Sequence, residues 1–309
     1  MVQTKRLAAL LLTLLALLPV PSILADSGVV SGTTVSGTVR VYLSSISSKT
    51  SVDVSVDGSY SIGGDTDRAI ARGTQLTVSN SGGTLRLAMN GNTQTMGSRF
   101  KLRRHQTSGN NGVRIAQARK PQSLYPGDIE FIAKGGNVQI IVHVYMEDYM
   151  RGVLPYEMDN SFPLEALKAQ AVAARSYCLN KLGSGSHKDG ADVCTDYSHC
   201  QSYVSQDELI ARYGKTTTES IMTKVKNAVK ETAGQIITWN GKPALAVFHS
   251  SSYRMTESSK NIWGGNVPYL TSVSTPESDR VSTVTLTDSD IASLFASDSA
   301  VKVNSGGKK

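Results

Sequence analysis

The sequence predicts an α+β fold in which a β-rich N-terminal region precedes a mixed core with two main helices and a hairpin. Three observations support this fold class. Residues 27–125 contain short alternating runs of apolar and polar residues separated by Gly, Asn and Asp, which is typical of strands and turns. Residues 163–182 are rich in Ala and Leu at helical spacing. Asn240-Gly241 separates two apolar runs, as in a two-residue hairpin.

The composition indicates a folded chain. Its 309 residues can bury one large core or two smaller ones. Only 6% of residues are aromatic and 18% are charged, which together with abundant Gly favours a β-rich globular protein over a disordered one. Regularly spaced Lys and Arg with interleaved aromatic residues are missing from the sequence, so we expect no nucleic-acid partner.

The first 25 residues have the pattern of an export signal. Lys5 and Arg6 form a basic start, Leu7–Leu18 is almost wholly apolar, and Ala25 is a small residue suited to cleavage. The alternative is an uncleaved membrane anchor, because the apolar stretch is nearly long enough to span a bilayer. We expect an exported protein, extracellular or associated with the cell wall. Cleavage would lower the net charge from +7 to +5, because the segment holds Lys5 and Arg6 but no acid.

The region 26–125 is predicted to form the β-rich N-terminal part, with strands at 39–43, 51–56 and 84–88. Asp57-Gly58 and Asn90-Gly91 are hairpin signals. The polar segment 105–112 is the expected loop or soft boundary before a core at 126–280.

The core contains a strand at 137–145 and a short helix at 146–152, followed by an irregular segment that carries Glu157. A long helix comes next. Pro163 suits its first position, Glu165 lies in its first turn, and Gly183 is its stop signal. A rigid helix at this point could hold the Glu157 carboxyl group still, and the alternative is a surface glutamate before a core helix. The apolar stripe of this helix consists of Leu164, Leu167, Ala171, Ala174, Cys178 and Leu182.

A second helix is predicted over 217–233. Thr216 and Glu219 form a capping box, and Gly234 ends the helix. Two hairpin strands follow at 235–239 and 244–249. The sequence beyond Thr275 becomes polar, and residues 281–309 form a polar C-terminal tail.

Two of the three cysteines lie close in sequence to two histidines. Cys178 is on the apolar stripe and is expected to be a buried thiol. Two thiolates and two imidazoles can complete a closed tetrahedral zinc site of the structural kind. In an exported protein a disulfide between Cys194 and Cys200 is the alternative, and the spacing alone leaves both open. The four candidate ligands are His187, Cys194, His199 and Cys200.

A second polar cluster follows the predicted strand that ends at His249. A serine nucleophile with His249 as its base is disfavoured, because neighbouring strand residues point to opposite faces and no nucleophile elbow is present. Hydroxyl groups with nearby Trp263 and Tyr269 favour a rim that binds a polyol. The candidate substrate-binding residues of this part are His249, Ser250, Ser251, Ser252, Thr256, Glu257 and Trp263.

These segments together resemble the SpoIID/LytB family, named for the stage II sporulation protein D and the amidase enhancer LytB. The resemblance is most specific over 147–177, which includes Val-Leu-Pro-Tyr-Glu-Met (153–158) and Ala-Gln-Ala-Val-Ala-Ala-Arg-Ser-Tyr (169–177). It continues through 194–203, 234–239, 249–257 and 263–270. The β-rich part from about residue 38 is similar to the N-terminal region of that family in a less specific way.

The resemblance implies a peptidoglycan lytic transglycosylase that cuts glycan strands after their stem peptides have been removed. The essential acid of the family corresponds to Glu157. A conventional glycosidase needs two carboxylates, whereas a lytic transglycosylase needs one, because the 6-hydroxyl of muramic acid attacks the anomeric carbon. An apolar setting would raise the pKa of Glu157 for this dual role. We expect Val153, Leu154, Tyr156 and Met158 to supply that setting.

The resemblance also implies roles for further residues. Arg175 matches a motif position and could orient Glu157 or the substrate, a structural ion pair being the alternative. Tyr177, Gln201 and Tyr203 are further substrate-binding candidates. Zinc at the four His and Cys positions is implied, because some family members bind zinc in the corresponding segment.

Two departures from the family pattern bear on function. The family has Gly-Gly where this chain has Tyr253-Arg254, and many members continue beyond the end of this sequence. The substitution makes a second function credible, namely a non-catalytic glycan-binding enhancer of a peptidoglycan amidase. The expected partners are therefore peptidoglycan glycan strands and an N-acetylmuramoyl-L-alanine amidase.

Overall fold

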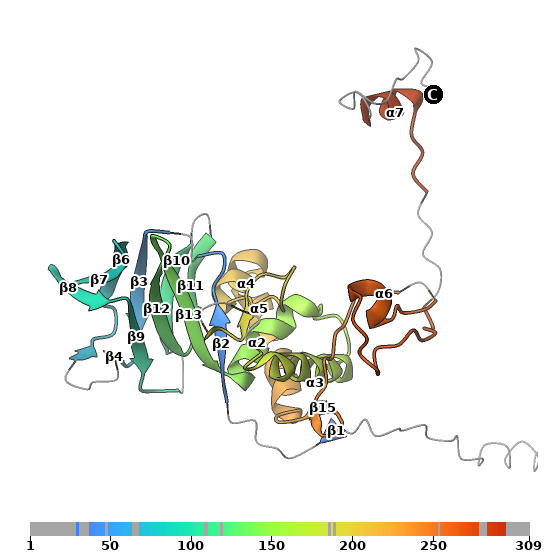
Figure 1. Cartoon of the computed structure of the whole chain (residues 1–309), viewed down its shortest axis with the longest axis horizontal. Coiled ribbons are helices and arrows are strands. Elements are labelled where there is room, and N and C mark those ends of the chain that lie inside the picture. The colour runs from blue at the N-terminus through green and yellow to red at the C-terminus, as the bar shows by residue number, and fades with distance from the viewer. Residues whose placement is uncertain are drawn as a thin grey trace, which may run out of the picture. The chain divides into compact units, whose positions relative to one another are not determined.

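The computed structural model describes residues 29–30, 37–46, 49–63, 68–107, 111–117, 120–184, 187, 190–252, 254–277 and 283–294. The predicted signal peptide and Tyr253 lie outside the described residues. The described part is β-rich first and helical later, which confirms the α+β fold class (Figure 1). Two compact units divide the chain at Val247/Phe248. Of the helices described, none has the length and apolar character needed to cross a membrane.

The first unit is built on two large sheets. The seven-stranded sheet has the order β14-β2-β13-β12-β9-β4-β5, and the six-stranded sheet has the order β11-β10-β3-β6-β7-β8. Strands of the two sheets contact each other, β13 with β3 and β6, and β12 with β7. The strands of the first sheet are β14 (Val193–Cys194), β2 (Thr38–Tyr42), β13 (Asn137–Tyr145), β12 (Asp128–Lys134), β9 (Arg99–Arg104), β4 (Tyr60–Ile62) and β5 (Ala69–Ile70). Those of the second are β11 (Lys120–Tyr125), β10 (Gly112–Gln117), β3 (Ser51–Asp57), β6 (Gln75–Ser81), β7 (Thr84–Met89) and β8 (Asn92–Gly97).

The strands predicted from alternation or apolar runs are confirmed as β2, β3, β7 and β13. Strand β13 is apolar along most of its length because the second sheet contacts it on one side and helix α2 (Met146–Glu157) also contacts it. The Asn90-Gly91 hairpin is also confirmed. Met89 pairs with Asn92, and the two turn residues have φ of 50° and 77°, as a type I′ turn requires.

The Asp57-Gly58 hairpin prediction is wrong. Strand β3 pairs with β6 and β10, whereas β4 pairs with β5 and β9, so the bend carries the chain from one sheet to the other. The glycine is required for a different reason. A Cβ at Gly58 would lie 2.6 Å from Oδ1 of Asn111, so any larger residue would collide with that side chain.

Helix α2 is longer than the predicted 146–152 helix and ends at Glu157, which therefore lies at a helix terminus and not in an irregular segment. Pro155 misled the prediction, because proline normally breaks a helix. It lies only two residues before the helix ends at Glu157, so little of the helix follows the proline. Val153 and Leu154 are fully buried and hold this last turn in the core.

Helix α3 (Leu164–Lys181) closely follows the prediction. Pro163 is the N-cap residue with extended backbone (ψ 153°), one position before the predicted one. Glu165 lies in the first turn and Gly183 has the left-handed φ of 69° expected of a helix stop. The middle of the predicted stripe is fully buried, namely Leu167, Ala171, Ala174 and Cys178.

Helices α4 (Gln206–Tyr213) and α5 (Lys215–Glu231) complete the helical layer next to the sheets (Figure 1). The predicted Thr216–Glu219 capping box is wrong, because α5 begins at Lys215 after Gly214 and has no side-chain cap. Helix α4 was not predicted from the sequence. Its capping signal is Ser205, whose hydroxyl accepts a hydrogen bond from the backbone N–H of Glu208.

The Asn240-Gly241 turn is confirmed between β15 (Ile236–Trp239) and β16 (Lys242–Pro243). Strand β15 pairs on its other side with β1 (Val29–Val30) in a three-stranded sheet. The predicted strand 244–249 is wrong beyond the turn. Ala244 still donates to the carbonyl of Ile237, but Ala246 and Val247 bond only to carbonyls two residues earlier.

The second unit, Phe248–Lys309, contains short elements. Met255 forms an antiparallel bridge with Ser274. Helix α6 (Ser259–Trp263) is capped by the hydroxyl of Ser258 and ends at Gly264, which has left-handed backbone. Helix α7 (Asp288–Leu294) lies within the segment expected to be a polar tail.

Candidate functional site

Glu157 is fixed at the C-terminal end of α2. Its side chain is half-buried, and its Oε1 accepts a hydrogen bond of 2.9 Å from the backbone N–H of Ser202. Burial raises the pKa of the Glu157 carboxyl group above its ordinary value, and the Ser202 hydrogen bond opposes this only in part. Neither of these two causes of the pKa shift is a neighbouring charged side chain. The carboxyl group is therefore suited to hold a proton at a higher pH than a solvated glutamate does.

The residues predicted to form the apolar setting of Glu157 differ in their burial. Val153 and Leu154 are fully buried, whereas Met158 is partly buried and Tyr156 is half exposed. The loop after Glu157 is tied to α5, because the ammonium group of Lys224 donates to the carbonyls of Asn160 (2.7 Å) and Phe162. Ser202 and Lys224 were not predicted from the sequence. Ser202 acts through its own backbone N–H and Lys224 binds backbone carbonyls, and no sequence motif marks either kind of contact.

Arg175 contacts Glu147 and not Glu157. The guanidinium group is fully buried, and its Nε and Nη2 donate to the two carboxylate oxygens of Glu147 at 3.0 and 2.7 Å. Nη1 donates to the carbonyl of Gln235, and Glu147 Oε1 also accepts from the N–H of Gly234. The pair thus joins α2, α3 and the turn before β15, which is a positioning arrangement.

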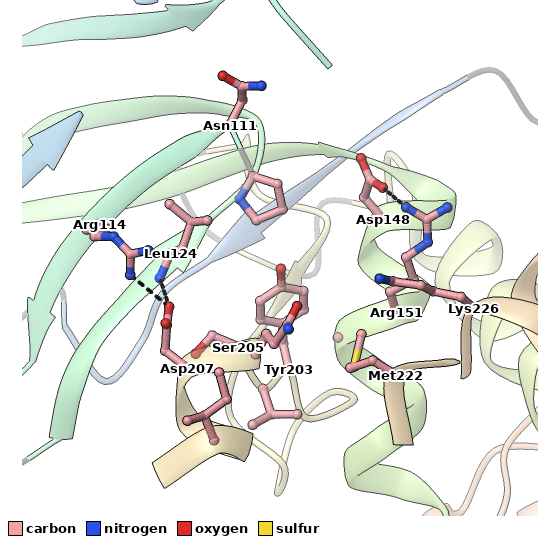
Figure 2. A pocket seen from close by; sticks show the side chains of 15 residues that line it. Asn111, Arg114, Leu124, Asp148, Arg151, Tyr203, Ser205, Asp207, Met222 and Lys226 are labelled. Atoms are coloured by element: carbon pink, nitrogen blue, oxygen red, sulfur yellow. Dashed lines mark hydrogen bonds and ion pairs between the residues drawn. The ribbon is translucent and has the colours of Figure 1, made fainter. Parts of the chain in front are cut away.

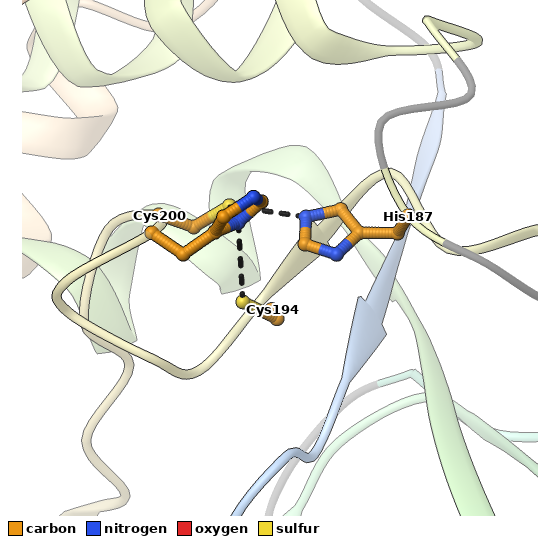
Figure 3. Close-up of side chains that lie close together, drawn as sticks. His187, Cys194 and Cys200 are labelled. Carbon is orange, nitrogen blue, oxygen red and sulfur yellow. Dashed lines mark hydrogen bonds between the residues drawn. The ribbon is translucent and has the colours of Figure 1, made fainter.

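Two histidines and two cysteines come together as predicted (Figure 3). Cys194 lies on β14, and the turn after it is held by Asp196, whose carbonyl accepts from the N–H groups of His199 and Cys200. Nε2 of His187 lies 3.1 Å from Sγ of Cys200. Nδ1 of His199 lies 3.3 Å from Sγ of Cys200 and 3.8 Å from Sγ of Cys194.

This donor set fits a metal ion. With Zn–S of about 2.3 Å and Zn–N of about 2.0–2.1 Å, a tetrahedral site has ligand atoms roughly 3.3–3.8 Å apart. The four ligand atoms here all lie within 4.8 Å of one another. All three cysteines are free and buried, so the alternative disulfide between Cys194 and Cys200 is not formed. The described residues thus contain a His₂Cys₂ cluster that could bind a metal.

The cluster has a polar neighbour in Tyr177. Its hydroxyl is hydrogen-bonded to Cys200, and burial, followed by the nearby thiols, raises its pKa to about 12. The hydrogen bond between the two thiols lowers the pKa of Cys200 to about 7 and raises that of Cys194, so Cys200 is the one of the pair that favours the thiolate. Tyr177, a predicted substrate-binding residue, is therefore placed beside the His/Cys cluster.

Gln201 and Tyr203, the other predicted substrate-binding residues of the first unit, are largely packed inside. Gln201 is buried and its Nε2 donates to the carbonyl of Ala174 on α3. The Tyr203 ring stacks on Tyr149 (centroids 5.7 Å apart) and on Tyr125 (6.1 Å). Gly152 makes room for this stack, because a Cβ there would lie 2.3 Å from the Tyr203 ring.

Tyr203 also lines a cavity of about 260 Å³ between α2, α4 and the edge of the six-stranded sheet. Figure 2 shows an ion pair on each side of it. Arg114 donates to Asp207 (3.1 Å) on one side, and Arg151 donates to Asp148 (2.7 Å) on the other. Asp207 also accepts from the N–H of Leu124, which docks α4 onto strand β11. Glu157 is not among the residues that line this cavity.

The remaining substrate-binding candidates belong to the second unit. Within it, the N–H of Ser252 donates to the carboxylate of Glu277, and Glu257 accepts from Asn261. The hydroxyl of Thr256 accepts from the N–H of Val273. The others expose their side chains, namely His249, Ser250, Ser251 and Trp263.

Arg254 has the backbone conformation of a glycine, which bears on one departure from the family pattern. Its φ is 56°, in the left-handed region that favours glycine. The resemblance places a family glycine at this turn, so the chain keeps a glycine-type backbone with an arginine side chain. Such a residue costs about 1–2 kcal/mol relative to glycine. Its neighbour Tyr253 lies outside the described residues.

Fold and site together define an α+β protein with a half-buried glutamate at a helix end and a His₂Cys₂ cluster that could hold a metal. Residues 134–239 match the family model described as SpoIID, Stage II sporulation protein. The resemblance found in the sequence is thus confirmed for this segment of the chain.

Proteins of similar sequence agree with this assignment. The chain is 36% identical over 140 residues to Stage II sporulation protein D of Bacillus subtilis, a match that covers 45% of this chain and 40% of that protein. It is 35% identical over 138 residues to Stage II sporulation protein D of Bacillus amyloliquefaciens, covering 44% of this chain and 40% of that protein. The Amidase enhancer of Bacillus subtilis is 35% identical over 121 residues, 39% of this chain and 14% of that protein. The aligned part thus spans less than half of each relative.

Proposed function

We propose that the protein is an exported lytic transglycosylase that cleaves peptide-free glycan strands of peptidoglycan and leaves 1,6-anhydro-muramyl ends. The observation that carries this proposal is Glu157, a half-buried carboxyl group with a raised pKa, held by the Ser202 N–H at the end of α2. The relationship to sporulation protein D supports the choice of substrate class.

In the proposed reaction Glu157 performs both proton transfers. Its protonated form first donates the proton to the glycosidic oxygen, and the bond from that oxygen to the anomeric carbon breaks. The carboxylate then removes the proton of the muramic acid 6-hydroxyl, whose oxygen bonds to the anomeric carbon and closes the anhydro ring. The second step restores the protonated Glu157, so water is not consumed.

One carboxyl group is enough for this chemistry. Conventional glycosidases need a second carboxylate about 5–9.5 Å away to activate water or to act as the nucleophile. No second charge contributes to the pKa shift of Glu157. This is the pattern expected when the substrate supplies its own nucleophile.

The surrounding residues act by positioning Glu157. The Ser202 N–H fixes one carboxylate oxygen, and Lys224 anchors the following loop to α5. Arg175, expected from the family to orient Glu157 or the substrate, would act indirectly by locking α2 to α3 through Glu147. We place the glycan-binding role of the second unit in its exposed hydroxyl groups and in Trp263.

We further propose that His187, Cys194, His199 and Cys200 hold a zinc ion. Four protein ligands leave no open position, so the metal would stabilise the fold and take no part in the reaction. The metal would mainly stabilise the turn that follows β14, because this turn is short and its hydrogen bonds are local.

The second candidate function is a non-catalytic enhancer of a peptidoglycan amidase, with N-acetylmuramoyl-L-alanine amidase as the partner. The similarity to the Amidase enhancer of Bacillus subtilis favours it, as does Arg254 at a turn where the family has glycine.

The two functions are separated by one comparison of purified protein with its Glu157→Gln variant. A transglycosylase releases anhydro-muramyl products by itself and loses this activity in the variant. An enhancer releases none, accelerates peptide release when an amidase is added, and is insensitive to Glu157→Gln.

A further inference from the structure

A second cavity lies beside the His/Cys cluster. Its volume is about 450 Å³, within the range of about 300–1,000 Å³ typical of small-molecule sites. Segments far apart in the sequence build it, namely the turn after β2, the end of β11, the turn between Cys194 and His199, and the start of α4. Glu157 does not line it. The hydroxyls of Ser44 and Thr195 are 3.2 Å apart and join two of these segments.

Aromatic rings form part of the cavity wall. Tyr197 lines the cavity and is 75% exposed, so its ring is open to a ligand. Tyr125 and Tyr203 stack at 6.1 Å with 21° between their planes, so their rings are held rigidly. The exposed ring of Tyr197 is therefore the one that offers a ligand a flat apolar surface with a polar tip. The C–H face of a pyranose ring is complementary to such a surface.

The polar groups of the cavity select for a neutral ligand rich in hydroxyls. Asp196 and Glu208 supply carboxylate acceptors, and Ser44, Ser45 and Thr195 supply hydroxyl groups that can donate or accept. The residues that line the cavity include no lysine or arginine. A carboxylate on the ligand would therefore meet two carboxylates without a compensating cation.

From these features we infer that the cavity binds a neutral N-acetylhexosamine unit of a glycan strand, with Tyr197 as its stacking platform. N-acetylglucosamine fits this description, whereas muramic acid carries a lactyl carboxylate that Asp196 and Glu208 would repel. The inference rests on the proposed function, because it adds a subsite for the same strand. It assigns a binding role to the turn that the His/Cys cluster shapes, since Thr195, Asp196 and Tyr197 all lie between the ligands Cys194 and His199.

The test measures binding in the intact metal-loaded protein with Glu157→Gln as background, so that the strand is not cut. NMR titration with N,N′-diacetylchitobiose and with amidase-treated glycan strands gives the affinity and the residues that shift. We expect shifts at Thr195 and Tyr197, and affinity about tenfold weaker after Tyr197→Ala. Tyr197→Phe should restore the affinity, because it keeps the ring.

Tyr213→Ala is the matched control, since Tyr213 is an exposed tyrosine on α4 that does not line the cavity. Its affinity should equal that of the background protein. Metal content, measured for each variant, excludes loss of the cluster as the cause of weaker binding. Undiminished affinity in Tyr197→Ala would overturn the inference, as would binding without shifts at Thr195 or Tyr197.

Failure of the subsite and failure of the proposed function give different results. If the wild type releases anhydro products while Tyr197→Ala binds normally, the subsite is refuted and the transglycosylase stands. If Tyr197→Ala weakens binding while Glu157→Gln releases products like the wild type, the subsite stands and the role of Glu157 is refuted. Preference for free N-acetylmuramic acid over N-acetylglucosamine would also overturn the neutral-ligand assignment.

Discussion

The buried guanidinium group of Arg175 and the carboxylate of Glu147 form a two-pronged ion pair that joins helices α2 and α3. Arg175 is fully buried, whereas Glu147 is 30% exposed. The same carboxylate accepts from Gly234, and Arg175 donates to Gln235, so the pair also fixes the approach to β15. The ion pair therefore holds α2, the helix that ends in Glu157, in place against α3.

Removing only the Glu147 charge from this ion pair should strongly destabilise the protein. Glu147→Gln leaves the Arg175 charge buried without its partner, for which we expect a loss of about 3–5 kcal/mol in the free energy of unfolding. Urea denaturation measures it. Lys168→Gln, which removes an exposed ion-pair network with Glu165 and Glu231, should lower the free energy of unfolding far less, because solvent screens exposed charges. Equal losses in the two variants would contradict a special role for the Arg175 pair.

Much of the fold was predictable because local patterns and tertiary contacts agree there. Strand β13 and helix α3 have apolar residues in the patterns typical of a buried strand and of a helix. Most of these residues are buried in the structure, so pattern and packing agree. The prediction failed where a long-range contact decided the outcome. Pro155 should have ended α2, but buried Val153 and Leu154 hold the last turn, and Gly58 serves a contact with Asn111.

The candidate site was predictable to the extent that side chains alone define it. The His and Cys spacing indicated the cluster, and the family motif indicated Glu157. The N–H of Ser202 and the carbonyls held by Lys224 are backbone groups, which carry no residue-type signal. The sequence likewise could not reveal that Arg175 pairs with Glu147, because the two residues are 28 positions apart.

Gly152→Ala should disturb the tyrosine stack. The added Cβ would meet the Tyr203 ring at 2.3 Å, so the ring must leave its place between Tyr125 and Tyr149. We expect about 1–3 kcal/mol lower stability, measured by thermal or urea denaturation. The control is Gly37→Ala, where an added Cβ meets nothing within 4 Å. A stability loss of the same size in the control would show that the stack is not the cause.

Glu130 should make stability depend on pH. The hydrogen bond from His143 lowers the pKa of Glu130 below 4.5, although burial opposes it. A lowered folded-state pKa means that this contribution is present above pH 4.5 and is lost as the pH falls through the folded-state value. The wild type should thus be more stable than Glu130→Gln at pH 7, with the difference shrinking towards pH 3. Urea midpoints across this range measure it.

The matched control for that experiment is Glu219→Gln, because Glu219 is an exposed carboxylate with only a 4.0 Å contact to Lys215. Its midpoint should stay close to that of the wild type at pH 7. A difference between wild type and Glu130→Gln that grows as the pH falls would contradict the assigned direction of the Glu130 shift.

Removal of the metal should destabilise the protein if the His/Cys cluster binds zinc. Purified protein should contain one zinc per chain by elemental analysis, and a strong chelator should lower its melting temperature. Cys194→Ser should lose the metal. Cys178→Ala should keep it, because Cys178 lies on the buried face of α3 and outside the cluster. Absence of metal together with a mapped Cys194–Cys200 disulfide would refute zinc binding.

In the proposed reaction Glu157 alone performs the proton transfers of strand cleavage. Mass spectrometry of products from amidase-treated glycan strands tests it, with wild type, Glu157→Gln and Glu165→Gln compared. Glu165 is an exposed glutamate in the first turn of the next helix, so this variant controls for loss of a carboxylate. We expect 1,6-anhydro-muramyl ends from the wild type and Glu165→Gln, and none from Glu157→Gln. Release of the same products by Glu157→Gln would contradict it.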